Sequence, residues 1–248
     1  VFIGGNWKSN GNVSFVKSHF EKVLNQLKFD SNKCDVVVSP MSIHLGLAKE
    51  VNKGNVQISS QNVSLTKEGA FTGEISAIAL KDFGINWTLI GHSERRSLYG
   101  ESSTNVADKI LLAEGQGLNS IACIGETKDE RTSGKTLNVI FEQLNAIKDK
   151  KPDWSKIVIA YEPVWAIGTG LTATPDQAQE VHSEIRKWLK KEVSEKASNE
   201  TRIIYGGSVT EKNSDELIKK ADIDGFLVGG ASLKPEFVKI VESYKSKH

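Results

Sequence analysis

The sequence predicts an α/β fold, a closed (β/α)8 barrel in which eight parallel strands alternate with helices. Two observations lead to this fold. Apolar, β-branched segments recur eight times along the 248 residues, and segments with helical spacing separate them. The apolar segments are nearly continuous rather than alternating, which is typical of parallel strands that helices cover on both faces. Eight such units favour closure into a barrel.

The expected strands share a short run of Val, Ile, Phe, Trp or Tyr that ends at a glycine, polar or charged residue. In chain order they cover residues 2–7, 35–39, 56–61, 87–91, 120–125, 157–162, 202–206 and 225–229. An open, doubly wound sheet is the alternative, but no GxGxxG motif follows the first strand and no linker interrupts the chain. We therefore expect a single barrel domain over residues 1–248.

Three of the intervening helices have recognisable start signals. Ser42 precedes the helical pattern 43–51, Thr174-Pro175-Asp176 precedes 178–193, and Lys234-Pro235-Glu236 precedes 237–244. The second of these is expected to run from Pro175 to about Ala197, with its Lys and Glu runs on a solvated face.

Composition excludes several classes of function. With 32 basic and 31 acidic residues the formal charge is +1, which offers no general attraction for nucleic acid or an anionic membrane. No apolar run is long enough to cross a bilayer, and we expect a cytoplasmic protein. Cys34 directly precedes an expected strand and Cys123 lies within one, and both are predicted to be buried and reduced. The histidines lack the paired spacing of metal ligands, so no metal site is expected.

In a closed barrel the carboxyl ends of all strands meet at one rim, so residues that follow different strands come together. The candidates at this rim are Asn6 and Lys8 after the first strand, His92 to Arg96 after the fourth, Glu162 after the sixth, Gly206-Gly207-Ser208 after the seventh, and Gly229-Gly230 after the eighth.

Glu162 is the candidate base. Pro163 disfavours helix at the preceding residue, so the carboxylate is expected at an extended strand end. The glycine-rich loop beyond it, with Gly168 and Gly170, is typical of a closing lid. The alternative is an ordinary turn after a buried strand.

His92 follows the end of the strand 87–91 and comes just before a short helical turn. The positive end of that turn is expected to lower the pKa of the ring and keep it neutral, and a neutral ring can still donate to a carbonyl oxygen. The alternative is a capping histidine. Considered alone, Lys8 is equally consistent with a surface residue and with a site residue. Considered alone, Glu94 is more consistent with an ion pair to Arg95 or Arg96 than with a catalytic acid.

The glycine turns after the seventh and eighth strands favour a phosphate site, because barrels of this kind bind phosphate there through backbone N–H groups. Tight turns between strand and helix are the alternative for each pair taken alone. Together with Gly168 they indicate a small phosphate ester.

Five motifs in order resemble the triosephosphate isomerase family over essentially the whole chain. They are Gly4-Gly5-Asn6-Trp7-Lys8, residues 90–96 (IGHSERR), residues 160–170 (AYEPVWAIGTG), Tyr205-Gly206-Gly207-Ser208, and residues 227–233 (LVGGASL). The resemblance implies that Glu162 is the base and neutral His92 the electrophile and proton relay in the interconversion of dihydroxyacetone phosphate and D-glyceraldehyde 3-phosphate. This family is itself a standard case of that division of roles.

The resemblance further implies catalytic Lys8, steadied by Asn6 and Glu94, with Ser93 beside His92. It implies phosphate binding by Gly168, Ser208, Gly229 and Gly230, no cofactor, and a homodimer formed through the loop 62–76, whose Thr72 approaches the partner's rim. One departure is Leu171, at a lid hinge that often carries lysine in this family.

Two rival functions stay open on the residues alone. One is an isomerase or lyase of the same fold acting on a larger sugar phosphate. The other is an inactive barrel that binds a phosphate ester without proton exchange.

Overall fold

The computed structural model describes residues 1–167, 169 and 171–248. Its strands form a closed barrel in the order β1 to β8, and every neighbouring pair is parallel. The strands are β1 Phe2–Asn6, β2 Asp35–Ser39, β3 Gln57–Ser60, β4 Trp87–Ile90, β5 Asn119–Ile124, β6 Ile157–Tyr161, β7 Ile203–Tyr205 and β8 Gly225–Val228. The predicted (β/α)8 barrel is confirmed, with several strands one or two residues shorter than expected.

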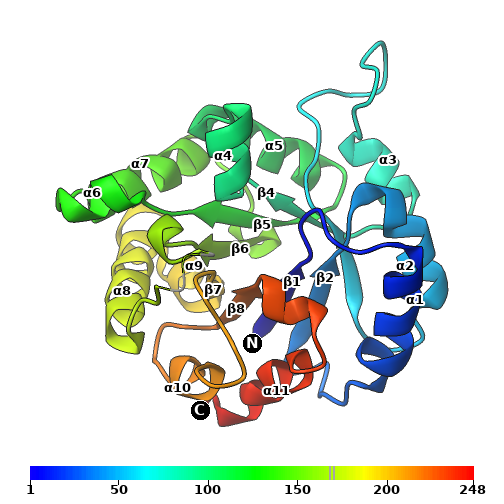
Figure 1. The fold of residues 1–248 in the computed structure, drawn as a ribbon. Helices are drawn as coiled ribbons and strands as arrows, with labels where there is room; N and C mark the ends of the chain where they lie inside the picture. Colours follow the sequence, from blue (N-terminus) through cyan, green and yellow to red (C-terminus); the bar gives the residue numbers. More distant parts are fainter. Residues whose placement is uncertain (168, 170) are drawn as a thin grey trace.

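Helices surround the barrel (Figure 1). They are α1 Val13–Lys22, α2 Leu45–Val51, α3 Ala77–Asp82, α4 Ser93–Tyr99, α5 Ser103–Gly115, α6 Lys128–Thr132, α7 Thr136–Asp149, α8 Pro175–Glu192, α9 Glu195–Glu200, α10 Ser214–Ile218 and α11 Phe237–Glu242. Within the described residues, no helix is both long and apolar enough to cross a bilayer.

Alternation along the strands divides the core in two. One buried cluster fills the barrel interior with Val158 and Ala160 of β6 and their counterparts on the other strands. A larger cluster lies between the strands and the helices and includes Ile157, Ile159 and Tyr161 of the same strand. Successive side chains on a strand point to opposite faces. A residue just beyond a strand is therefore expected to point either into the barrel or toward the helices, according to its place in this alternation. Cys34 and Cys123 are buried and unpaired, as predicted.

The helix predicted from Pro175 to about Ala197 is two helices. Its start is as expected, because Thr174 and Gln177 form a capping box ahead of Pro175. It ends earlier because the side chain of Ser194 accepts a hydrogen bond from the Ala197 N–H and so caps a separate helix, α9. Ser42 also differs from expectation, since it begins a 3₁₀ turn, Ser42–His44, and caps no helix.

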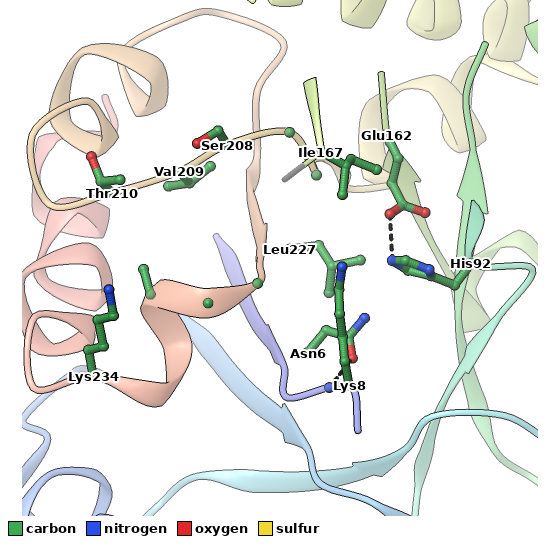
Figure 2. A pocket seen from close by; sticks show the side chains of 15 residues that line it. Asn6, Lys8, His92, Glu162, Ile167, Ser208, Val209, Thr210, Leu227 and Lys234 are labelled. Carbon is green, nitrogen blue, oxygen red and sulfur yellow. Dashed lines mark hydrogen bonds and ion pairs between the residues drawn. The ribbon is translucent and has the colours of Figure 1, made fainter. Parts of the chain in front are cut away.

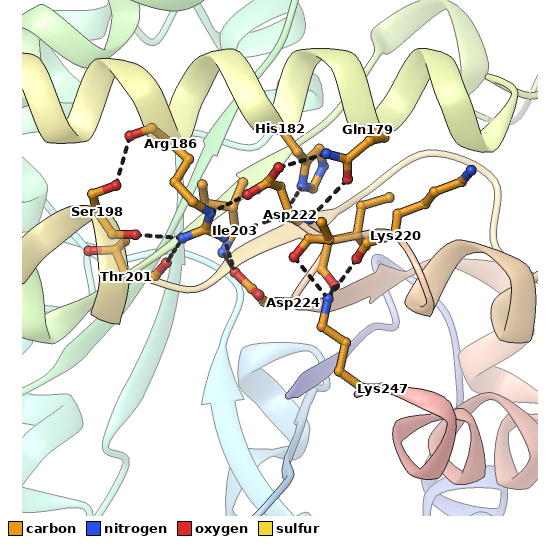
Figure 3. Close-up of polar contacts among 12 residues, drawn as sticks. Gln179, His182, Arg186, Ser198, Thr201, Ile203, Lys220, Asp222, Asp224 and Lys247 are labelled. Carbon is orange, nitrogen blue, oxygen red and sulfur yellow. Dashed lines mark hydrogen bonds and ion pairs between the residues drawn. The ribbon is translucent and has the colours of Figure 1, made fainter.

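A polar network closes the opposite end of the barrel, at the amino ends of β7 and β8 (Figure 3). Arg186 of α8 donates to Asp222 Oδ1 at 2.7 Å, to Asp224 Oδ2 at 2.5 Å and to the Ser198 carbonyl at 2.7 Å. Asp224 also accepts the Ile203 N–H at 2.9 Å. The guanidinium therefore joins α8 and α9 to the starts of two strands, in charge-assisted bonds that fix its orientation.

His182, beside this network, gives the protein a specific sensitivity to acid. It is fully buried, and Nδ1 lies 3.0 Å from the Asp222 carbonyl oxygen, which assigns the ring proton to that nitrogen. Nε2 has no partner among the described residues. Burial lowers the pKa of His182 from 6.5 to about 4, so the folded protein binds this proton more weakly than the unfolded chain does. Stability due to His182 is therefore lost as the pH falls from 6.5 to about 4 and is unaffected above that range.

We expect His182→Asn to flatten this acid dependence. Asparagine can keep the donor to the Asp222 carbonyl but cannot titrate, so about 3 kcal/mol of pH-dependent loss should disappear. Urea denaturation from about pH 7 to about pH 4.5 measures this. The variant should start less stable at neutral pH because its side chain is smaller. An acid slope equal to that of wild type would contradict the assignment.

Candidate active site

A cavity of about 280 Å³ opens at the carboxyl ends of the strands. Figure 2 shows Glu162 and His92 on one side of it, Lys8 and Asn6 nearby, and Ser208 further along the opposite wall. The predicted candidates that line it are Asn6, Lys8, His92, Glu162, Ser208, Gly229 and Gly230. Side chains distant in sequence thus meet at the rim, as the barrel requires.

Glu162 continues the inward-pointing series of β6 over the barrel mouth. Its N–H donates to the Ile124 carbonyl at 2.7 Å, and its side chain is only 3% exposed. The chain passes so close to β5 that a Cβ on Gly125 would lie 1.7 Å from the Glu162 carbonyl oxygen. Only glycine fits there. Position and direction of the carboxylate are therefore fixed by packing around its own backbone.

His92 reaches the pocket because Gly91 redirects the chain. Trp87 and Leu89 point into the barrel interior, so simple alternation would turn residue 92 outward. Gly91 has φ +73°, a conformation that side chains rarely adopt, and it breaks this alternation. His92 then caps α4, and its Nδ1 accepts the Glu94 N–H at 3.1 Å. Nε2 is left to donate to Glu162 Oε2 at 2.8 Å.

The electrostatics of His92 differ from the sequence-based expectation. Burial lowers the pKa of the ring, but the Glu162 carboxylate and, further away, Glu94 raise it by more, and the pKa lies above its ordinary value. The predicted lowering of the pKa of His92 is therefore wrong. The prediction takes account of the helix end alone, whereas the Glu162 carboxylate in contact with Nε2 has the larger effect on the pKa. At Nδ1 the nearer group is an N–H donor, which opposes protonation of that nitrogen, and Glu94 Oε2 is further away at 3.5 Å.

Lys8 is held in place through both its backbone and its side chain. Its Nζ donates to Glu94 Oε1 at 2.7 Å, and its N–H donates to Asn6 Oδ1 at 3.0 Å. Glu94 therefore pairs with Lys8; the alternative pairing with Arg95 or Arg96 is wrong, since Arg95 bonds Glu101 instead. Lys8 has φ +53°, which is rare outside glycine and costs about 1–3 kcal/mol. Strain retained at such a residue is typical of a functional position.

The far part of the pocket presents backbone donors. Within the described residues, no hydrogen bond uses the N–H of Ser208 or Gly229, and Gly230 begins a 3₁₀ turn, where its N–H has no partner in the turn. A Cβ on Gly229 or Gly230 would meet nothing within 4 Å, so the space above both is open. By contrast, a Cβ on Gly207 would lie 2.1 Å from the Tyr205 hydroxyl, so packing accounts for that glycine.

Ser93 and Glu94, two of the predicted site residues, do not line this cavity. Ser93 lines an adjoining cavity of about 350 Å³, which also reaches Glu162. Gly168 lies outside the described residues. Glu162 Oε1 is buried without a protein partner in the described part of the chain.

Sequence reasoning missed Glu126, a fully buried carboxylate beside the segment that follows Glu162. Its Oε1 accepts the Tyr161 hydroxyl at 2.9 Å and the Trp165 indole N–H at 3.0 Å, so it connects Trp165 to β6. The signal was available, because Glu126 follows the fifth strand at the same rim. Ile167, Leu227 and Lys234 also line the pocket and were not predicted to do so.

The site combines three features: a buried carboxylate in contact with an imidazole, a fixed ammonium, and unused backbone N–H groups. Together they define the class of protein, a (β/α)8-barrel enzyme suited to acid–base chemistry on a small anion. The family model described as triosephosphate isomerase matches residues 1–244. The chain is 53% identical to the cytosolic triosephosphate isomerase of Oryza sativa subsp. japonica over 98% of this chain and 96% of that protein.

Two further relatives agree. The Neurospora crassa triosephosphate isomerase is 51% identical over 98% of this chain and 97% of its own length. The chloroplastic triosephosphate isomerase of Arabidopsis thaliana is 53% identical over 99% of this chain and 78% of its own length. The chain therefore belongs to the triosephosphate isomerase family, as its motifs predicted.

Proposed function

We propose that this protein interconverts dihydroxyacetone phosphate and D-glyceraldehyde 3-phosphate by proton transfer through an enediolate. The observation that carries the proposal is the 2.8 Å contact between His92 Nε2 and Glu162 Oε2, in a pocket that also holds Lys8.

Glu162 acts as the base in this proposal. Its carboxylate takes a proton from the hydroxymethyl carbon of dihydroxyacetone phosphate and becomes a carboxylic acid, while the electron pair of the C–H bond forms the enediolate. The acid then returns a proton to the neighbouring carbon, giving the aldehyde and restoring the carboxylate. A positioned base contributes about 10²- to 10⁴-fold in rate.

His92 and Lys8 serve the oxygen atoms. His92 donates from Nε2 to the carbonyl oxygen and relays protons between the two oxygens of the enediolate, and the Lys8 ammonium stabilises its charge. A donor aimed at a developing oxyanion contributes about 2.7–4 kcal/mol. A substrate oxygen that replaces the Glu162 carboxylate at Nε2 removes the main group that raises the pKa of His92, so binding favours the neutral ring.

The segment after Glu162 is proposed to close over the bound ester. Closure would exclude water from the enediolate and disfavour loss of its phosphate by elimination. Ser208, Gly229, Gly230 and Gly168 would bind the phosphate through backbone N–H groups. Leu171, at the far hinge, would alter the kinetics of closure and not the chemistry.

A coupled assay of triose phosphate interconversion, run in both directions, tests the proposed function. Turnover of both triose phosphates, with none of a larger aldose phosphate, is the expected result. Binding of a phosphate ester without turnover would instead support the inactive barrel.

We also propose a homodimer through the loop 62–76, which protrudes from the barrel between β3 and α3 (Figure 1). The base of the loop is held by a hydrogen bond in which the Ser64 N–H donates to the Ile75 carbonyl at 2.9 Å. Phe71, further along the loop, is 46% exposed. Exposure of such a ring favours cover by a partner. Thr72, also exposed, would then approach the partner's rim. Sedimentation equilibrium should give twice the chain mass of 27.2 kDa, and a monomer at micromolar concentration would contradict the proposal.

The cellular location and the expected lack of nucleic-acid partners stay predictions. Relatives named cytosolic and chloroplastic are about equally similar to the chain.

A further inference from the structure

Lys234 is a second cation in the active-site pocket. It follows the 3₁₀ turn Gly230–Leu233 and precedes Pro235 and α11. Figure 2 shows it with Thr210 on the side of the pocket away from Glu162 and His92, and Ser208 and Val209 lie between the two sides. The proton-transfer groups and this ammonium therefore occupy opposite ends of one cavity.

The backbone that carries Lys234 is well anchored. Its N–H donates to the Ala231 carbonyl at 3.3 Å, and its own carbonyl accepts the Phe237 N–H at 3.1 Å. Ser232, which is fully buried, bonds the Gly229 carbonyl through its hydroxyl at 2.6 Å. Pro235 restricts Lys234 to the extended conformation that it adopts. The side chain is exposed, but it starts from a fixed point at the pocket wall.

The turn that carries Ser208 and Thr210 is also fixed. Asn213 accepts the Thr210 N–H at 2.8 Å and donates to the Ser208 carbonyl at 3.0 Å, which orients the turn that carries the Ser208 N–H. An anion bound by the N–H groups of Ser208 and Gly229 would therefore lie against a fixed turn, in the cavity that Lys234 also lines.

Charge in the pocket is unevenly compensated. Lys8 is paired with Glu94, and Glu162 contacts His92. Lys234 also lines the pocket. By contrast with Lys8, it forms no ion pair with any carboxylate in the described part of the chain. Since the formal charge of the whole chain is only +1, attraction of an anion has to come from local groups such as this one.

We propose that Lys234 is a positioning residue that draws the phosphate end of the substrate to the Ser208 and Gly229–Gly230 side of the pocket and disfavours the reversed orientation. The inference rests on the proposed function. A triose phosphate has one dianionic end and one neutral end. Glu162 repels the dianion from the reacting end, and Lys234 attracts it to the other.

The expected size of the effect follows from Coulomb attraction. For a unit cation and a dianion about 8 Å apart in water it corresponds to about fivefold in affinity. Because Lys234 is exposed, salt should screen most of this, as the Debye length falls from about 30 Å at 0.01 M to about 8 Å at 0.15 M.

Steady-state kinetics as a function of ionic strength test the inference, with Lys234→Gln, Lys234→Arg and Lys239→Gln. Lys239 is exposed on α11 and does not line the pocket, so its variant controls for a general loss of positive charge. At low ionic strength Lys234→Gln should raise KM, and the inhibition constant of inorganic phosphate, about fivefold while kcat changes far less. At high salt, KM and the phosphate inhibition constant of Lys234→Gln should lie within about twofold of the wild-type values. Lys234→Arg should bind as well as wild type.

A KM and salt dependence of Lys234→Gln equal to those of wild type would overturn the inference. So would an equal effect of Lys239→Gln, or a loss confined to kcat. A wild-type protein without triose phosphate turnover would overturn the proposed function instead. In that case calorimetric titration with inorganic phosphate, in wild type and Lys234→Gln, would still decide whether Lys234 binds the anion.

Discussion

Glu162→Gln should lower kcat by about 10²- to 10⁴-fold while binding of phosphate esters changes by less than about threefold. Glutamine has nearly the same shape, and its amide oxygen can still accept from His92 Nε2, so the pocket should keep its structure. It cannot take a proton from carbon at neutral pH. The change therefore removes the proposed base and leaves the proposed phosphate site, which Ser208, Gly229 and Gly230 line in the same cavity.

Glu162→Asp separates charge from position. The carboxylate survives but is withdrawn by one methylene group, and a displacement of about 1 Å can cost about 10²-fold. Stopped assays with each variant, and competition by inorganic phosphate, provide the rates and the affinities. A glutamine variant that keeps kcat within a few-fold of wild type would remove Glu162 from the role of base. Phosphate affinity lost in parallel with kcat would indicate a disrupted pocket.

His92→Gln should slow isomerisation by about 10²-fold, close to the loss of one oxyanion donor. The amide can occupy the position of the ring and donate one hydrogen bond, so ground-state binding should be little affected. It cannot pass a proton between two oxygens, so the distribution of solvent label in the product should change. His248→Gln, at an exposed position, is the control for loss of an imidazole elsewhere.

The pH profile gives a second readout for His92. Glu162 raises the pKa of the ring above 6.5, so the inactive imidazolium accumulates in the free protein as the pH falls through that raised value. The acid limb of kcat/KM, which reports groups of the free enzyme, should therefore move to lower pH in His92→Gln. An unchanged acid limb and unchanged exchange with solvent would exclude His92 from the relay.

Most of the fold could be predicted because its signals are local and repeated. Each strand is an apolar run. In a barrel the residue after each run lies at the rim, so rim residues can be predicted from the sequence alone. This logic brought Asn6, Lys8, His92 and Glu162 together correctly. It was weaker where a side chain competes with the backbone, as at Ser194, which begins a new helix inside an otherwise continuous helical pattern.

The remainder depended on contacts that sequence does not contain. The pKa of His92 follows from the Glu162 carboxylate at 2.8 Å, a partner 70 residues away along the chain (162 − 92 = 70). The pairing of Glu94 with Lys8, rather than with its neighbours Arg95 and Arg96, also needs the packing of two loops. Glu126 and Lys234 could not be predicted for a different reason. Both follow expected strands, but neither belongs to a motif that by itself indicates a function.

Proton transfer to and from carbon is the central claim, and isomerisation followed by ¹H NMR in heavy water tests it most directly. With dihydroxyacetone phosphate as substrate, a carboxylate that exchanges its proton before returning it should leave deuterium on the carbon next to the aldehyde in part of the product. Product that forms at an undiminished rate with only protium on that carbon would indicate a direct hydride shift. That result would contradict the role assigned to Glu162.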